Sequence, residues 1–159
     1  MHPNAELITE LYSAFAARDH TRMARCYRPE ATFSDPVFMD LKGDEVTAMW
    51  RMFCVRGTDL SVTFGDVAAD DGQGSARWEA RYTFAPTGRA VHNRIEASFR
   101  FVDGKILEHR DRFDFYRWSR MALGPPGVLL GWSPLVLSKV RKQARSQLDA
   151  FIASEEAAR

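Results

Sequence analysis

The sequence predicts an α+β fold in which a curved antiparallel sheet is covered by helices on one side. Apolar residues recur at helical spacing in the first third of the chain, and a two-residue alternation replaces that spacing from Thr58 onward. Three successive strand-like segments then share one design, with an aromatic-rich face opposite a face of mixed charge. We therefore expect one face of the sheet to pack on helices and the other to meet solvent or a partner.

Three helices are expected before the long strands. The first spans about residues 4–18 behind an Asn4 cap and carries Tyr12 on its buried stripe. A short second helix follows Asp19 and is expected to stop at Pro29, because proline cannot continue a helix. The third helix opens near Asp44 and closes at Gly57.

The strands begin with a short segment, ATFSD, in which Asp35 shares the face of Phe33 and Pro36 ends regular pairing. Four further strands are separated by turn residues rich in Gly, Asp and Pro. Their expected ranges are 58–64, 75–85, 91–102 and 104–116.

The last of these strands, GKILEHRDRFDFY, contains the leading site candidate. Its alternation places His109 and Asp111 on an otherwise apolar face with Leu107, Phe113 and Phe115. Ionisable groups among phenylalanines are costly to bury unless something offsets their desolvation. The pair could serve a reaction, or could only satisfy helix ends and backbone groups inside the fold.

We divide the chain into residues 1–118, the main domain, and 119–159, an apolar segment and a helix that pack on or extend it. Residues 124–132 are rich in Gly and Pro yet apolar, so they could cover the core, close a pocket or contact another subunit. Ser133 and Pro134 then begin a final helix, whose basic face is interpreted as a solvated surface.

Composition narrows the function classes. The 159 residues suit one domain, and 22 basic against 21 acidic residues give no overall field for nucleic acid or an anionic membrane. Cys26 and Cys54 lack metal-ligand spacing and are expected to be buried free thiols. Without a signal-like or membrane-spanning segment, we expect a cytoplasmic protein with neither a nucleic-acid nor a membrane partner.

Four short motifs occur in a recognisable order. They are YSAF at Tyr12, ATFSDPV around Asp35, PTGR at residues 86–89, and DGKI through HRDRFD at residues 103–114. Over about residues 6–116 the chain resembles the nuclear transport factor 2-like (NTF2-like, cystatin-like) superfamily, especially SnoaL-like polyketide cyclases, ketosteroid isomerases and limonene epoxide hydrolases. The resemblance implies a cone-shaped fold, with a bent sheet wrapped around helices and a deep pocket between them, here with an extra C-terminal helix.

The resemblance also suggests roles for single residues. The isomerase pattern implies a general base at Asp35 and an oxyanion donor at Tyr12, but Ala97 stands where a second, protonated aspartic acid is expected. The epoxide hydrolase pattern implies a catalytic aspartate at Asp111.

The remaining arginine and aspartate of the epoxide hydrolase pattern would fall on Trp78 and Ala80. The neighbouring Arg77 and Glu79 have suitable chemistry, but they belong to the opposite face of the strand. Only a β-bulge would turn them inward, and we expect none.

These observations predict an aromatic pocket for a small hydrophobic molecule, without cofactor or metal. Asp35, His109, Asp111 and Tyr12 are the catalytic candidates. Expected substrate contacts are Phe33, Trp78, Tyr82, Asn93, Phe99 and Phe113.

The expected chemistry is proton abstraction beside a carbonyl, or water activation. In the first case Asp35 takes the proton, Tyr12 or Asp111 donates to the oxyanion, and His109 orients or shuttles.

Each assignment has a structural alternative. Asp35 could only cap a turn, and Tyr12 could be a core tyrosine with a satisfied hydroxyl. The competing class of function is a non-catalytic binder, or a protein that forms a homodimer through the charged face of the sheet. That face is expected to carry Arg77, Glu79, Arg81, Arg94, Glu96, Arg100, Arg110 and Arg112.

Overall fold

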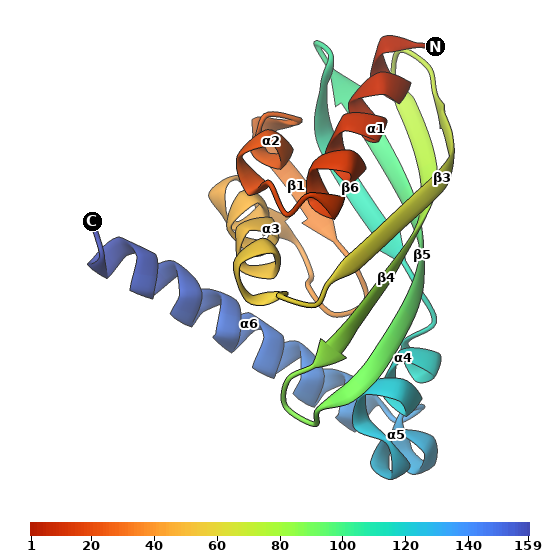
Figure 1. Cartoon of the computed structure of the whole chain (residues 1–159), viewed down its shortest axis with the longest axis vertical. Helices are drawn as coiled ribbons and strands as arrows, with labels where there is room; N and C mark the ends of the chain where they lie inside the picture. The colour runs from red at the N-terminus through yellow and green to blue at the C-terminus, as the bar shows by residue number, and fades with distance from the viewer.

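The computed structural model describes residues 1–159 and contains one six-stranded sheet in the order β2-β1-β6-β5-β4-β3. The sheet curves strongly, with α1, α2 and α3 on its inner side and the long α6 running below α3 (Figure 1). The strands are β1 (Tyr27–Ser34), β2 (Leu41–Lys42), β3 (Ser61–Ala69), β4 (Gln73–Phe84), β5 (Arg89–Val102) and β6 (Lys105–Arg112). The helices are α1 (Pro3–Ala16), α2 (His20–Ala24), α3 (Asp44–Arg56), α4 (Phe115–Leu123), α5 (Pro125–Leu130) and α6 (Pro134–Ala157). None of the helices is long and apolar enough to cross a membrane.

The start of α1 differs from the expected Asn4 cap. The helix begins at Pro3, and the Nδ1 atom of His2 accepts the Asn4 backbone N–H at 3.0 Å. The buried Asn4 amide instead donates to the carbonyl oxygens of Asp70 and Asp71 at 3.0 and 3.2 Å. Asn4 therefore fastens the helix to the β3–β4 turn.

The expected helical stop at Pro29 was wrong. Helix α2 ends at Ala24, and Pro29 lies within β1. Proline is tolerated there because the pairing of β1 with β6 changes register between Tyr27 and Thr32. At Pro29 the regular pairing is interrupted, so the absence of a backbone N–H breaks no hydrogen bond between the strands. As a result Tyr27 belongs to a strand rather than to a helix.

The sheet is antiparallel except at one junction. Strands β3 to β6 pair antiparallel as expected, whereas β1 and β6 run parallel, which corrects the all-antiparallel expectation. The parallel pairing places Phe33 beside His109 and Tyr27 beside Ile106. It places the N-terminal residues of β1 beside β6, the strand that carries His109 and Asp111.

The site strand is shorter than expected. It ends at Arg112, because Asp114 caps α4 by accepting the Arg117 backbone N–H at 3.0 Å. A register shift near its start leaves Leu107 without a partner in β5, so Ile106 is buried in its place. Phe115 consequently belongs to α4.

The Gly- and Pro-rich segment is helical rather than irregular. Helix α5 packs against α4, and the contact is so close that a Cβ atom on Gly127 would lie 2.0 Å from the carbonyl oxygen of Ser119. Only glycine fits this crossing.

Helix α6 begins as expected, with Ser133 as cap and Pro134 as its first residue. Its Leu148 and Phe151 join the main core, and Arg51 of α3 makes two hydrogen bonds of 2.6 Å to Glu155. Residues at the far end of the chain are thus part of the same core as residues near its start.

The outer face of the sheet carries cross-strand ion pairs. Glu96 of β5 lies 3.9 Å from Arg77 of β4 and 3.6 Å from Arg112 of β6, and Arg100 lies 3.1 Å from Glu108. Cys26 and Cys54 are buried free thiols, as expected.

Removing the fully buried side chain of Leu148 tests whether α6 is integral to the core. We expect Leu148→Ala to cost about 2–5 kcal/mol of unfolding free energy, measured by urea denaturation, because it leaves a cavity between α6 and the core. The control Leu135→Ala, on the exposed first turn of α6, should change stability by less than about 0.5 kcal/mol. Equal effects of the two variants would contradict this role of α6.

Candidate functional site

A cavity of about 310 Å³ opens between the inner face of the sheet, α3, α4 and α6. Its wall is mainly apolar, which suits a small hydrophobic ligand. Six residues predicted from the sequence line it: Asp35, Trp78, Tyr82, Asn93, Asp111 and Phe113.

Four other predicted residues lie behind the wall and do not line the cavity: Tyr12, Phe33, Phe99 and His109. The Tyr12 ring lies among those of Phe64, Trp78 and Phe99, with centroids 5.6–6.4 Å away. Its hydroxyl is buried and has no hydrogen-bond partner, and burial raises its pKa well above the ordinary value. In this position the hydroxyl does not reach a ligand in the cavity.

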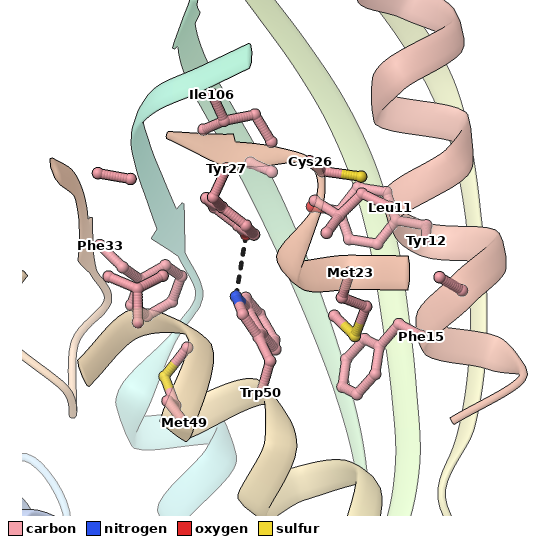
Figure 2. Close-up of a cluster of buried hydrophobic side chains, with 14 of the residues drawn as sticks. Leu11, Tyr12, Phe15, Met23, Cys26, Tyr27, Phe33, Met49, Trp50 and Ile106 are labelled. Carbon is pink, nitrogen blue, oxygen red and sulfur yellow. Dashed lines mark hydrogen bonds between the residues drawn. The ribbon is translucent and has the colours of Figure 1, made fainter. Parts of the chain in front are cut away.

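A chain of hydrogen bonds runs through the core to Asp111. Trp50 Nε1 donates to the Tyr27 hydroxyl at 2.9 Å, as Figure 2 shows. The hydroxyl lies 2.8 Å from His109 Nδ1, and His109 Nε2 lies 2.8 Å from Asp111 Oδ1. Each of these side chains is almost fully buried, so each polar atom needs a partner within the protein.

The direction of this chain fixes the tautomer of His109. An indole nitrogen only donates, so the Tyr27 oxygen accepts from Trp50 and its own proton goes to His109 Nδ1. With Nδ1 accepting, the imidazole proton sits on Nε2 and is donated to Asp111. The histidine therefore holds Asp111 through its Nε2–H group.

Asp111 is the last residue of this hydrogen-bond chain, and it also lines the cavity. Its Oδ1 accepts from His109 and, at 3.4 Å, from the Trp78 indole. Its Oδ2 has no hydrogen-bond partner in the protein. The Tyr12 hydroxyl is the only fully buried side-chain oxygen or nitrogen atom that lacks a partner, so Asp111 Oδ2 is not fully buried and retains accessible surface. Since Asp111 lines the cavity, Oδ2 is the atom available to a ligand.

Asp35 uses its two oxygens in the same divided way. Oδ1 caps the turn after β1, accepting the N–H groups of Val37 and Phe38 at 2.7 and 2.6 Å. Oδ2 has no partner in the protein and lies at the cavity. Burial raises the Asp35 pKa from 3.8 to about 7, the two backbone N–H groups oppose that rise, and the charge of Asp111 adds to it.

Asn93 and Tyr82 complete the polar lining. The Asn93 side chain is 6% exposed, faces the cavity from β5, and makes no hydrogen bond within the protein. The Tyr82 hydroxyl accepts from the Trp118 indole at 2.9 Å, which leaves its own proton free to donate.

Sequence reasoning missed two members of the chain and one wall of the cavity. Tyr27 lies within the range expected for the second helix and Trp50 within the range expected for the third, and neither was predicted to take part in the site. Helix α6 contributes Val140, Gln143 and Gln147 to the cavity. The sequence predicted that this helix packs on or extends the main domain, but carried no signal that it borders a cavity.

The fold and this inner site define a protein of the NTF2-like class. The sequence matches the SnoaL-like domain family over residues 8–109, and the chain belongs to this family. Among curated proteins, none matches the sequence.

Solved structures share the fold at low sequence identity. An NTF2-like protein of unknown function from Burkholderia pseudomallei is 18% identical, with a TM-score of 0.66 over 76% of this chain and 98% of its own. IdmH of Streptomyces antibioticus, a suspected polyketide cyclase, is 22% identical, with a TM-score of 0.62 over 74% and 96%. An LEH-like epoxide hydrolase from M. tuberculosis is 18% identical, with a TM-score of 0.64 over 86% and 96%.

Tyr27 and Tyr12 form a matched pair for testing the hydrogen-bond chain. We expect Tyr27→Phe to cost about 1–3 kcal/mol of stability, because it leaves the Trp50 N–H and His109 Nδ1 buried and unpaired. Tyr12→Phe removes a buried hydroxyl that has no partner, so we expect it to be neutral or stabilising. Urea denaturation measures both, and a loss for Tyr12→Phe equal to that for Tyr27→Phe would contradict the chain.

The pKa of Asp35 predicts how stability depends on pH. Between pH 3.8 and about 7 the folded protein keeps this proton while the unfolded chain releases it, so the contribution of Asp35 to stability falls as pH rises. We expect Asp35→Asn to remove this fall and to be more stable than wild type at pH 8 by about 1–3 kcal/mol. The amide oxygen can still accept from Val37 and Phe38.

Thermal unfolding from pH 4 to 8 measures this effect. Asp103→Asn is a suitable control, because Asp103 is exposed and its left-handed backbone conformation suits asparagine. Parallel pH profiles for wild type and Asp35→Asn would contradict the prediction.

Proposed function

We propose that this protein is a cofactor-independent enzyme that moves protons on a small hydrophobic carbonyl compound, as an isomerase or a cyclase does. One observation supports this most directly. In each of two carboxyl groups, those of Asp35 and Asp111, Oδ1 accepts hydrogen bonds from the protein and Oδ2 is left free at the same cavity. Their partners in the protein differ, because Asp111 accepts from two side chains and Asp35 from two backbone N–H groups.

Asp111 is the proposed base. His109 and Trp78 donate to its Oδ1 and hold the carboxylate in place, and its free Oδ2 is positioned to take a proton from the carbon beside a carbonyl group. The electron pair of the broken C–H bond then moves onto the carbonyl oxygen, giving an enolate.

Asp35 is the proposed acid. Its Oδ1 accepts two backbone N–H groups, so a proton on this carboxyl belongs on Oδ2, where it can be donated to the enolate oxygen. In an isomerase, Asp111 then returns its proton to another carbon of the enol while the enol oxygen returns its proton to Asp35. In a cyclase, the enol carbon instead attacks a second carbonyl group of the same molecule, the enol proton returns to Asp35, and the new alkoxide takes the proton held by Asp111. This division is the reverse of the one expected from the resemblance, and it does not use Tyr12.

Asn93 is proposed to bind a second polar group of the substrate. Its amide lies at the cavity wall without a hydrogen-bond partner in the protein, so it is free to bond to a ligand oxygen there. A cavity of about 310 Å³ suits a flat molecule of two or three rings.

Epoxide hydrolysis has less support. Arg77 and Glu79 would be needed at the cavity, but β4 pairs with β5 in unbroken register from Gln73 to Phe84, so no bulge turns them inward. Glu79 pairs instead with His92 and Arg94 on the outer face.

Hydrogen–deuterium exchange of 2-tetralone in D₂O, followed by proton NMR, tests the proposed step without knowledge of the natural substrate. We expect the protein to accelerate exchange beside the carbonyl, and Asp111→Asn to lose about 10²–10⁴-fold of that rate. Asp35→Asn should lose less, because its amide can still donate a hydrogen bond to the oxyanion. The wild-type rate should fall as pH rises through about 7, where Asp35 loses its proton, and Asp35→Asn should lack this fall.

Asp103→Asn again serves as the control and should exchange 2-tetralone as fast as wild type. An Asp111→Asn variant that binds and exchanges the ketone at the wild-type rate would rule out the assigned base. Binding of 2-tetralone and related flat ketones without any acceleration would favour the non-catalytic binder.

A further inference from the structure

Five large apolar side chains are exposed together where α5 meets α6. Leu129, Trp132 and Leu135 are 69%, 71% and 81% exposed, and Val128 and Leu130 are about half exposed. We call these five residues the apolar tip. Figure 1 places α5 at the opposite end of the molecule from the N-terminus. A contiguous apolar surface of this kind on one end of a protein is typical of an interaction site.

The charge around the apolar tip is of one sign. Residues 115–148 contain six basic residues and no acidic residue, whereas the rest of the chain has 16 basic and 21 acidic residues. The net charge of the whole chain is near zero, which led us to expect no membrane partner. That total conceals the concentration of basic residues in this segment. Locally, the segment has the field that attracts an anionic surface.

Two of the basic residues continue directly from the apolar tip. Leu135, Lys139 and Lys142 follow at helical spacing on one side of α6, and all three are exposed. Neither lysine makes an ion pair within the chain, so both ammonium groups are free. An apolar end with lysines along its flank is the pattern of an element that lies in a lipid–water interface.

The polar groups of the apolar tip are satisfied without outside help. Trp132 Nε1 donates to the Leu129 carbonyl at 2.9 Å, and the Tyr116 hydroxyl donates to the Val128 carbonyl at 2.9 Å. Inserting the tip into an apolar phase therefore leaves no indole or phenol proton unpaired.

A lipid surface fits these observations better than a second copy of the chain. A symmetric contact through the apolar tip would bring two positively charged segments near each other, each with Lys139 and Lys142 unpaired, whereas Arg145 further along α6 is paired with Glu45 and Asp149. The same charge is complementary to phospholipid headgroups that carry negative charge.

We propose that the apolar tip docks on an anionic lipid surface, with Trp132, Leu129 and Leu135 inserted and Lys139 and Lys142 at the headgroups. Trp118 of α4 and Val140 of α6, the two helices that flank the docked segment, also line the cavity. Docking would bring the cavity close to lipid-dissolved molecules. The docking itself does not depend on the proposed chemistry.

Vesicle flotation of the full chain tests the proposal. We expect the protein to float with vesicles of phosphatidylcholine and 30% phosphatidylglycerol, and at least tenfold less with phosphatidylcholine alone or at high salt. Leu129→Ser with Leu135→Ser should reduce binding at least tenfold, and Lys139→Gln with Lys142→Gln severalfold. Met39→Ser with Val55→Ser, at exposed apolar positions elsewhere, should bind as wild type does.

Tryptophan fluorescence supplies an independent readout. Trp132 is the only exposed tryptophan, since Trp50, Trp78 and Trp118 are buried. Anionic vesicles should therefore shift the emission to the blue and protect Trp132 from acrylamide, and Trp132→Phe should abolish the shift but retain most of the flotation.

Three outcomes would overturn the proposal. They are no flotation with either vesicle, flotation that ignores the lipid charge, and a concentration-dependent blue shift without lipid that coincides with a dimer in sedimentation. The last would assign the apolar tip to a second copy of the chain.

Discussion

The hydrogen-bond chain from Trp50 through Tyr27 and His109 to Asp111 is the constraint on which the inner half of this structure depends. A buried polar group without a partner costs about 1–3 kcal/mol, so four such groups are tolerable only if they satisfy one another. Their meeting requires α3, β1 and β6 to lie together, and it requires β1 to run parallel to β6. The same contacts therefore hold three elements together and fix the position of one carboxylate.

The sequence could predict the face on which His109 and Asp111 lie, because strand alternation is a local property of the chain. It could not predict their partners. Tyr27 and His109 are 82 residues apart, and Pro29 favoured a helix end over the strand that forms. The direction of β1 relative to β6 carries no signal in alternation, so the parallel junction was also missed. Asp35 was expected to share the strand face of Phe33, but it lies just past the end of β1, and only the fold shows that one of its oxygens caps the turn while the other has no partner in the protein.

Membership in the SnoaL-like domain family determines the fold of the chain more firmly than it determines which ligand the chain binds. The matched region ends at residue 109, whereas Asp111, Phe113, Trp118 and the lining residues of α6 lie beyond it. The general base proposed here and one wall of the cavity thus come from the part of the chain outside the match. Proteins that share the cone can therefore differ in the chemistry and the size of the ligand they accept.

The state of Asp35 follows from a balance that the cavity can change. Two backbone N–H groups favour the carboxylate, yet they reach only Oδ1, and the loss of solvent around the group together with the charge of Asp111 outweighs them. The balance sets the pKa of Asp35 at about 7. A hydrophobic ligand that displaces water from Oδ2 removes more solvation and raises this pKa further, so binding itself favours the protonated acid.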